Sequence, residues 1–205
     1  TNAIFETISG YTTTGSTILN DIESLPKGIL FWRSLTHWIG GMGIIVLAIA
    51  ILPLLGIGGM QLFAAEAPGP SADKLHPRIT DTAKRLWLIY FGYTAAETLF
   101  LSLAGMSFFD ALNHSMSTLS TGGFSTKNAS MAFWNDSPLI QYIVIFFMFL
   151  AGTNFVLSYF AFKGNVSKVV KDEEFKLYFK FIVIFTLIVG GIIYYNSFLE
   201  GASAF

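Results

Sequence analysis

The chain has 205 residues, of which 53% are hydrophobic and 12% are charged, and its mean hydropathy is +0.60. Soluble domains carry roughly 25% charged residues, so this composition indicates a membrane protein. Twelve basic and 13 acidic residues leave a net charge of -1, which argues against nucleic acid as a partner. The sequence has no cysteine and therefore no disulfide or thiol-ligated metal. It starts at Thr1 without a signal-peptide pattern, so we expect an internal piece of a longer chain.

Four windows of low charge are long enough to cross a bilayer, which takes about 20 apolar residues in a helix. They predict spanning helices near residues 34–54, 84–105, 138–162 and 177–198. Two more uncharged windows, 7–20 and 111–126, are too short and too rich in Ser, Thr and Gly to cross. We expect these two to be re-entrant segments, each a short helix followed by a loop. The sequence therefore predicts an all-α, polytopic membrane protein.

The basic residues indicate the orientation of the chain. Nine of the twelve lie in two segments, 53–85 and 163–180. Cytoplasmic loops of membrane proteins are enriched in Lys and Arg, so we expect both segments in the cytoplasm. The two re-entrant segments then open on the outer face of the cytoplasmic (inner) membrane, and lipid surrounds the multi-pass chain.

An internal repeat relates the two re-entrant segments. A shift of 108 residues aligns 3–17 with 111–125 without a gap. Identities fall at Ala3 and Ala111, Ser9 and Ser117, Thr13 and Thr121, and Gly15 and Gly123. A spanning helix follows each segment, so the repeated unit is an outer helix, a short pore helix, a pore loop and an inner helix. Internal repeats are characteristic of channels and transporters, and we expect these units to surround an ion pore.

The repeat divides the chain into five parts. Residues 1–55 are the end of a first unit, 56–83 a cytoplasmic loop, 84–162 a complete second unit, 163–176 a cytoplasmic linker, and 177–205 the first helix of a third unit. Ser107, three residues before Asp110, predicts a capping box at the start of the second short helix. The end of this helix, near Leu119, points its negative dipole end inward, where a cation is favoured.

Thr/Gly-rich loops at membrane depth suit ion coordination. Non-helical backbone is tolerated there only inside protein or beside water. Its carbonyls can replace the water shell of an ion, and glycine permits dihedrals that a β-carbon would forbid. Ser120–Phe124 resembles the Thr-Val-Gly-Tyr-Gly filter of potassium channels, and Thr12–Ser16 is a looser version. Two such loops in register, each between a short and a long helix, are a strong signal.

Six runs of the sequence then resemble a known family. They are Tyr11–Leu19, Trp38–Pro53, Gly58–Leu62, Ala67–Pro70, Ser120–Thr126 and Ala151–Phe155. Together they look like the potassium-translocating membrane subunit of the bacterial Trk system, within the Trk/Ktr/HKT superfamily. The resemblance covers essentially the whole chain. It implies four helix–loop–helix repeats around one pore, a homodimer, and a cytoplasmic nucleotide-binding regulatory subunit of the Trk type.

The resemblance also implies which residues hold the ion. The first filter strand matches Thr13, Thr14 and Gly15, and the second matches Thr121, Gly122 and Gly123. Potassium would be held by the backbone carbonyls of Thr13, Thr14, Thr121 and Gly122. The chain departs from the family pattern in extent, because the first helix of repeat one and the loops of repeats three and four are not in it. This piece alone should not conduct.

Five other features carry competing interpretations. We interpret the mid-span Glu97 as a carboxyl that faces the bundle and bonds a neighbouring helix, with a place on the ion path as the alternative. For His37 and His114 we favour polar packing over a metal site. Arg33 is interpreted as an interfacial anchor that reaches the headgroups. Gly40–Gly43 is read as a close-packing site rather than a nucleotide loop.

The sequence therefore predicts potassium uptake through a filter of backbone carbonyls. The first alternative is sodium or mixed sodium–potassium translocation on the same scaffold. Filter glycines generally favour potassium in this superfamily, and Gly15 and Gly123 are both present. The second is an intramembrane enzyme. Glu97 without a nearby Asp or His pair does not supply a catalytic constellation, so we predict no enzyme. A purely structural scaffold leaves the Thr/Gly loops without a purpose.

Overall fold

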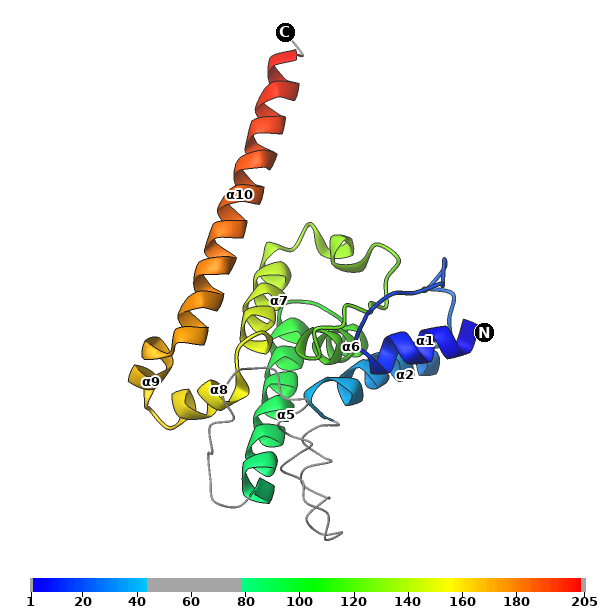
Figure 1. Ribbon diagram of the computed structural model, residues 1–205. Helices are drawn as coiled ribbons and strands as arrows, with labels where there is room; N and C mark the ends of the chain where they lie inside the picture. Colours follow the sequence, from blue (N-terminus) through cyan, green and yellow to red (C-terminus); the bar gives the residue numbers. More distant parts are fainter. Residues whose placement is uncertain (1, 44–78, 204–205) are drawn as a thin grey trace. The chain divides into compact units, whose positions relative to one another are not determined.

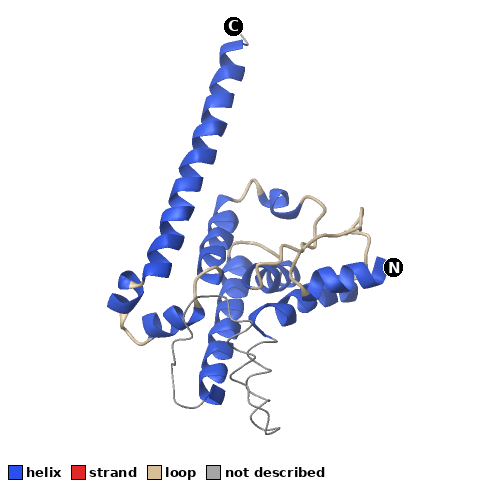
Figure 2. Ribbon diagram, in the orientation of Figure 1, coloured by secondary structure: helices blue, strands red, loops and turns tan. Residues whose placement is uncertain are grey.

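The computed structural model describes residues 2–43 and 79–203 (Figure 1). The chain divides into two compact units, Thr1–Tyr159 and Phe160–Phe205. Helices and loops make up the described ranges, and no strand occurs within them (Figure 2). The predicted all-α fold class is confirmed.

The first unit begins with the two helices that flank the first Thr/Gly loop. α1 (Asn2–Tyr11) is the predicted short helix, and it packs against α2 (Lys27–Trp38). α2 continues as η1 (Ile39–Gly43), where Gly41 leaves helical geometry with ψ -135°. This helix starts earlier than the predicted 34–54, and the rest of that predicted span lies outside the described residues.

Most of the predicted second repeat, up to Tyr159, lies in the first unit. The repeat comprises α5 (Ile79–Leu103), α6 (Phe108–Leu119), η3 (Ser130–Trp134), α7 (Pro138–Ala151) and α8 (Phe155–Phe162). α6 starts where the capping box predicts, because the Ser107 hydroxyl accepts the Asp110 N–H at 3.1 Å. A core of buried apolar side chains joins α5, α6 and α7: Leu101, Met106, Ala111, Ile140 and Val144. This core holds the short α6 inside the unit.

The predicted span 138–162 is not one straight helix. α7 and α8 are bent by 104° at the break between Ala151 and Phe155. α8 then starts anew, with the Asn154 side-chain oxygen accepting the Val156 N–H at 3.0 Å. A hydropathy window responds only to composition, and for that reason it cannot register a bend inside an apolar run.

Two described helices are long and apolar enough to cross a membrane, at Lys84–Leu103 in α5 and Glu173–Tyr195 in α10, and the bent α7–α8 pair makes a third if it counts as one span. Both helices match predicted spans. α5 also exposes large apolar side chains, including Leu88, Phe91 and Leu103. Large exposed apolar surfaces mark contact with lipid or with other protein.

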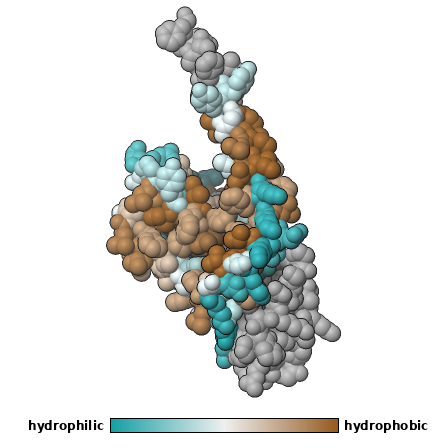
Figure 3. Space-filling model, turned by 90° about the vertical axis from the view of Figure 1, so that its left-hand side faces the viewer, coloured by the Kyte–Doolittle hydropathy of each residue, from teal (hydrophilic) through white to brown (hydrophobic). Residues whose placement is uncertain are grey.

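The second unit contains α9 (Val166–Lys171) and α10 (Glu173–Ser203). The Asp172 carboxylate accepts the Phe175 N–H at 2.9 Å, and Glu173 and Glu174 place negative charge in the first turn of α10. Both features stabilise a helix start. Figure 3 shows apolar side chains, in brown, along the middle of this helix, and none of its spanning stretch is buried. α10 contains the predicted first helix of a third repeat.

Candidate functional site: two re-entrant loops

Both short helices end in the same hydrogen-bonded turn. In a Schellman motif, the amide two residues past the helix cap bonds a carbonyl five residues back, and the preceding amide bonds one three residues back. At the end of α1, Thr14 N–H donates to the Ser9 carbonyl and Thr13 N–H to the Gly10 carbonyl, both at 3.0 Å. At the end of α6, Gly122 N–H donates to the Ser117 carbonyl at 2.9 Å and Thr121 N–H to the Thr118 carbonyl at 3.0 Å. Each bond in α1 has its counterpart 108 residues later in α6. The sequence repeat is therefore also a structural repeat.

Each turn places a threonine in an unfavourable backbone conformation. Thr13 has φ +53° and Thr121 has φ +56°. Glycine usually takes this left-handed position of a Schellman motif, and a β-branched residue is a genuine outlier there. Such strain costs on the order of 1–3 kcal/mol and gathers at functional sites. Two strained threonines at equivalent places point to these loops as the functional part of the fold.

The residues after these threonines repeat a second feature. Gly15 has φ +75° and Gly123 has φ +93°, whereas Thr14 and Gly122 between them do not have positive φ. The sign of φ thus alternates along both triplets. In an extended strand successive carbonyls point to opposite sides, and the alternating φ changes that pattern. A β-carbon on Gly15 would lie 1.9 Å from the Gly122 carbonyl oxygen, so the loops touch here.

The two predicted filter strands meet at this contact, through Gly15 on one side and Gly122 and Gly123 on the other. The strands are Thr13, Thr14 and Gly15 in the first loop and Thr121, Gly122 and Gly123 in the second. All six of these residues are partly or fully exposed. A hollow of about 280 Å³ adjoins the second loop, with Thr121, Gly122 and Gly123 among its lining residues.

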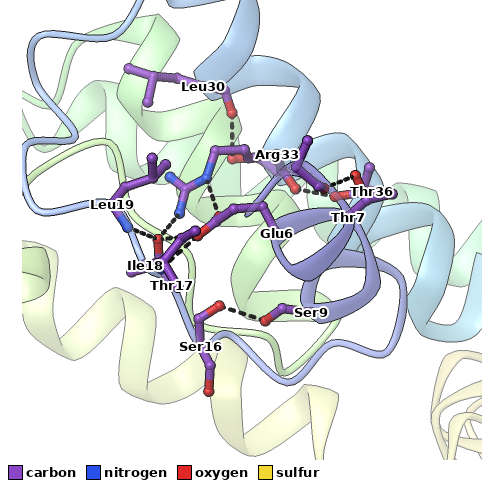
Figure 4. Close-up of polar contacts among 12 residues, drawn as sticks. Glu6, Thr7, Ser9, Ser16, Thr17, Ile18, Leu19, Leu30, Arg33 and Thr36 are labelled. Atoms are coloured by element: carbon purple, nitrogen blue, oxygen red, sulfur yellow. Dashed lines mark hydrogen bonds and ion pairs between the residues drawn. The ribbon is translucent and has the colours of Figure 1, made fainter. Parts of the chain in front are cut away.

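A side chain of each short helix clamps the loop that follows it. Glu6 Oε1 accepts the Thr17 hydroxyl at 2.6 Å and the Ile18 N–H at 2.7 Å (Figure 4). His114 Nε2 lies 3.0 Å from the Ser125 hydroxyl. Sequence analysis did not assign this role to either residue. The signal was in the repeat alignment, which pairs Glu6 with His114 and Thr17 with Ser125.

Arg33 is not an interfacial anchor, and that interpretation was wrong. The residue is only 5% exposed. Its Nε donates to Glu6 Oε2 at 3.2 Å, and its Nη2 donates to the Thr17 hydroxyl at 3.1 Å (Figure 4). The carboxylate partner lies 27 residues away, in a re-entrant helix, and it keeps the guanidinium inside the protein.

The second loop is held against α2 by an aromatic contact. The ring of Phe124 stacks on His37, with ring centres 3.9 Å apart and planes 13° apart. His37 Nδ1 also lies 3.3 Å from the Ser117 hydroxyl, and that hydroxyl accepts the Gly123 N–H at 2.9 Å. The expected polar packing of His37 and His114 is confirmed by these serine contacts. His37 thus supports the second loop from the inner helix of the first repeat.

The segments beyond the two loops are joined as well. The Asn128 side-chain oxygen accepts the Ile22 N–H at 2.7 Å, and its amide donates to Asp21 at 3.3 Å. The bond from Asn128 lowers the pKa of Asp21 below its usual value. A further ion pair joins Lys127 to Glu23 at 3.9 Å. These contacts join the segments that follow the two loops.

The start of α6 is tied to the exit of the second loop through Asp110. Thr126 and Ser107 each donate a hydroxyl to its carboxylate, at 2.6 and 2.7 Å. Burial raises the pKa of Asp110, but the two hydrogen bonds and the nearby Lys127 outweigh it, so that its pKa lies below the usual value. The carboxylate also suits the positive end of the helix dipole.

Two interpretations about the helices are resolved by their neighbours. Gly40 and Gly41 do serve close packing: β-carbons there would meet the Tyr11 carbonyl oxygen at 2.2 Å and the Ser120 β-carbon at 2.9 Å. Their partners are the ends of the two short helices. Glu97 is fully buried in the bundle near Thr118 of α6. The side chain of Thr118 is its polar neighbour on that helix, as expected for a carboxyl that faces the bundle.

The repeated helix–loop units and the helices long and apolar enough to cross a membrane define the class of the chain as an all-α protein with candidate membrane spans. A family model described as TrkH, cation transport protein, matches residues 1–195. The chain belongs to this family, which is one of transport proteins and not of enzymes.

Known relatives agree with this assignment. The Trk system potassium uptake protein TrkH of Escherichia coli K12 is 50% identical over 195 residues, covering 92% of this chain and 40% of the relative. The TrkG protein of the same organism is 42% identical over 199 residues, covering 96% and 39%. The crystal structure of the potassium transporter TrkH from Vibrio parahaemolyticus matches with TM-score 0.72 and 44% identity, over 92% of this chain and 37% of that one. The chain thus spans about 40% of the length of these curated relatives.

Proposed function

We propose that the protein to which this chain belongs takes up potassium across the cytoplasmic membrane, and that the loops at 12–16 and 120–124 form part of its selectivity filter. In this proposal the carbonyls of Thr13, Thr14, Thr121 and Gly122 replace the water shell of the ion. Potassium is the cargo of the pore and not a resident cofactor. The relatives described above are named potassium uptake proteins, which supports the choice of ion.

One observation carries the proposal. The two loops share the same φ pattern, positive at Thr13 and Gly15 and again at Thr121 and Gly123, 108 residues apart. They also meet at the Gly15–Gly122 contact. An ordinary turn needs no second copy in the same geometry, whereas a filter made of backbone carbonyls needs several equivalent strands around one axis.

The remaining parts of the proposal follow the family resemblance. We propose a homodimer in the inner membrane, gated by a cytoplasmic nucleotide-binding subunit of the Trk type. The relatives' names place them in a Trk system, which supports association with further components. Sodium translocation on the same scaffold is the competing function, and the same experiment separates the two.

The test compares two glycines in the full-length protein, expressed in a host deficient in potassium uptake. Gly123→Ser adds a side chain to a proposed filter residue with φ +93°. The control, Gly105→Ser, adds one to a turn residue with φ +102°. A β-carbon meets nothing within 4 Å at either position. The two variants therefore share the dihedral strain. We expect Gly123→Ser to lower the uptake ratio of potassium to sodium per assembled protein, and Gly105→Ser to leave it unchanged. An unchanged ratio in well-assembled Gly123→Ser protein would remove the proposal.

A further inference from the structure

Arg33 contacts both filter loops from one position on α2. Its guanidinium donates to Glu6 and to the Thr17 hydroxyl, two residues beyond Gly15 (Figure 4). The same guanidinium lies 4.1 Å from the ring centre of Phe124, which directly follows Gly123. One buried side chain therefore contacts the exits of both loops.

We propose that Arg33 is a positioning residue that sets the two filter loops relative to each other, so that the ion preference of the pore depends on its guanidinium. This inference rests on the proposed function. It adds a specificity-determining side chain to a filter that otherwise consists of backbone atoms.

The chemistry of the contact requires arginine. Glu6 accepts from Thr17 and Ile18 through one oxygen and from Arg33 through the other. The planar guanidinium can donate along its edge to Glu6 and Thr17 while its face lies over the Phe124 ring. Lysine would retain the charge, but its compact ammonium lacks both the fork and the flat face. We therefore expect Arg33→Lys to be a poor substitute.

The second repeat shows that this loop can be built without such an arginine. α7, the helix of the second repeat that corresponds to α2, contains no arginine or lysine, and its seventh residue is Val144 where α2 has Arg33. In that repeat His114 lies within hydrogen-bond distance of Ser125 and of the Asp110 carbonyl oxygen, and the cation that acts on it is Lys127, which is not on the inner helix. The turn and the φ pattern are the same in both repeats. Arg33 is thus not needed to form a loop of this shape, and its distinctive contribution is the link between two loops.

Charge balance gives the inference a second consequence. A buried guanidinium beside a cation path repels cations unless it is neutralised, and Glu6 supplies the opposite charge. Glu6→Gln leaves the guanidinium unpaired, whereas the double variant Glu6→Gln/Arg33→Gln removes both charges together. We expect Glu6→Gln to lower potassium uptake per assembled protein, and the double variant to recover part of that loss.

The experiment uses the full-length protein in the uptake-deficient host and measures two quantities: assembled protein, and the potassium-to-sodium uptake ratio per assembled protein. We expect Arg33→Gln and Arg33→Lys to lower the ratio by about two- to tenfold, the lower part of the range found for coupled contacts. Arg85→Gln is the matched control, because the Arg85 guanidinium also lies over a ring, that of Tyr159, 5.3 Å from its centre, but touches neither loop. Its ratio should be that of the unaltered protein.

The outcomes separate the inference from the proposed function. An unchanged ratio in assembled Arg33→Gln protein overturns the inference. If that variant does not assemble, Phe124→Leu, which removes the ring and leaves the Glu6–Arg33 pair, gives the decision by the same ratio. Gly123→Ser is measured alongside: if it lowers the ratio while the Arg33 and Phe124 variants do not, only the positioning role fails. If Gly123→Ser also has no effect, the filter assignment itself fails.

Discussion

The contact between the two loops predicts that alanine at Gly15 and at Gly123 will have unequal effects. Both glycines have positive φ, so a β-carbon at either adds about 1–2 kcal/mol of backbone strain. At Gly123 the new methyl group meets nothing within 4 Å. At Gly15 it would lie 1.9 Å from the Gly122 carbonyl oxygen. Non-bonded atoms settle near 3.5 Å, so that carbonyl must retreat by about 1.5 Å.

The displaced carbonyl is one of the proposed ion ligands, which makes the effect specific to ion preference. Gly15→Ala should lower both the assembled amount and the potassium-to-sodium uptake ratio more than Gly123→Ala does. Gly105→Ala, at a left-handed turn residue with free space around it, controls for the strain alone. Purification yield and rubidium and sodium uptake in the deficient host measure the two effects. Equal results for Gly15→Ala and Gly123→Ala would refute the loop contact.

Three further predictions follow from other residues. Asp110→Asn should lower the melting temperature of the purified full-length protein at neutral pH. Because the pKa of Asp110 is depressed in the folded protein, the difference in melting temperature from the unaltered protein should shrink as the pH falls below the usual aspartate pKa. A difference that stays constant with pH would contradict this. Glu97→Gln should keep both assembly and ion preference, because the fully buried side chain lies beside Thr118 of α6 and an amide can make the same polar contact, and an altered ratio would instead place it on the ion path. A topology reporter should read cytoplasmic near Lys171 and external near Asn128, and an internal Asn128 would contradict the orientation.

Local patterns predicted the parts of the fold that local interactions build. The Ser107–Asp110 spacing gave the start of α6, and the repeat alignment placed both Thr/Gly loops at the ends of short helices. These features depend on neighbours within a few residues. Gly40 and Gly41 inside η1 were also correctly interpreted as packing sites, since a missing side chain in an apolar helix allows close approach.

Long-range pairings could not be predicted in the same way. In the sequence Arg33 has the pattern of an interfacial anchor, and only the fold places Glu6 beside it. The hydrogen bond from Ile22 to Asn128 spans 106 residues, and no sequence pattern predicts it. Glu97 is buried beside a neighbouring helix as its chemistry suggests, but its neighbour there, Thr118 of α6, could not be named from the sequence. The bend between α7 and α8 escaped notice because both sides of it are equally apolar.

The most direct test of the filter assignment is to locate the ion. Crystals of the full-length protein grown with thallium in place of potassium, measured for anomalous scattering, would show where a potassium-like cation sits. The account predicts anomalous peaks in contact with the carbonyl oxygens of Thr13, Thr14, Thr121 and Gly122, which disappear when sodium replaces thallium. Thallium bound elsewhere in the pore, with no peak between these two loops, would contradict it.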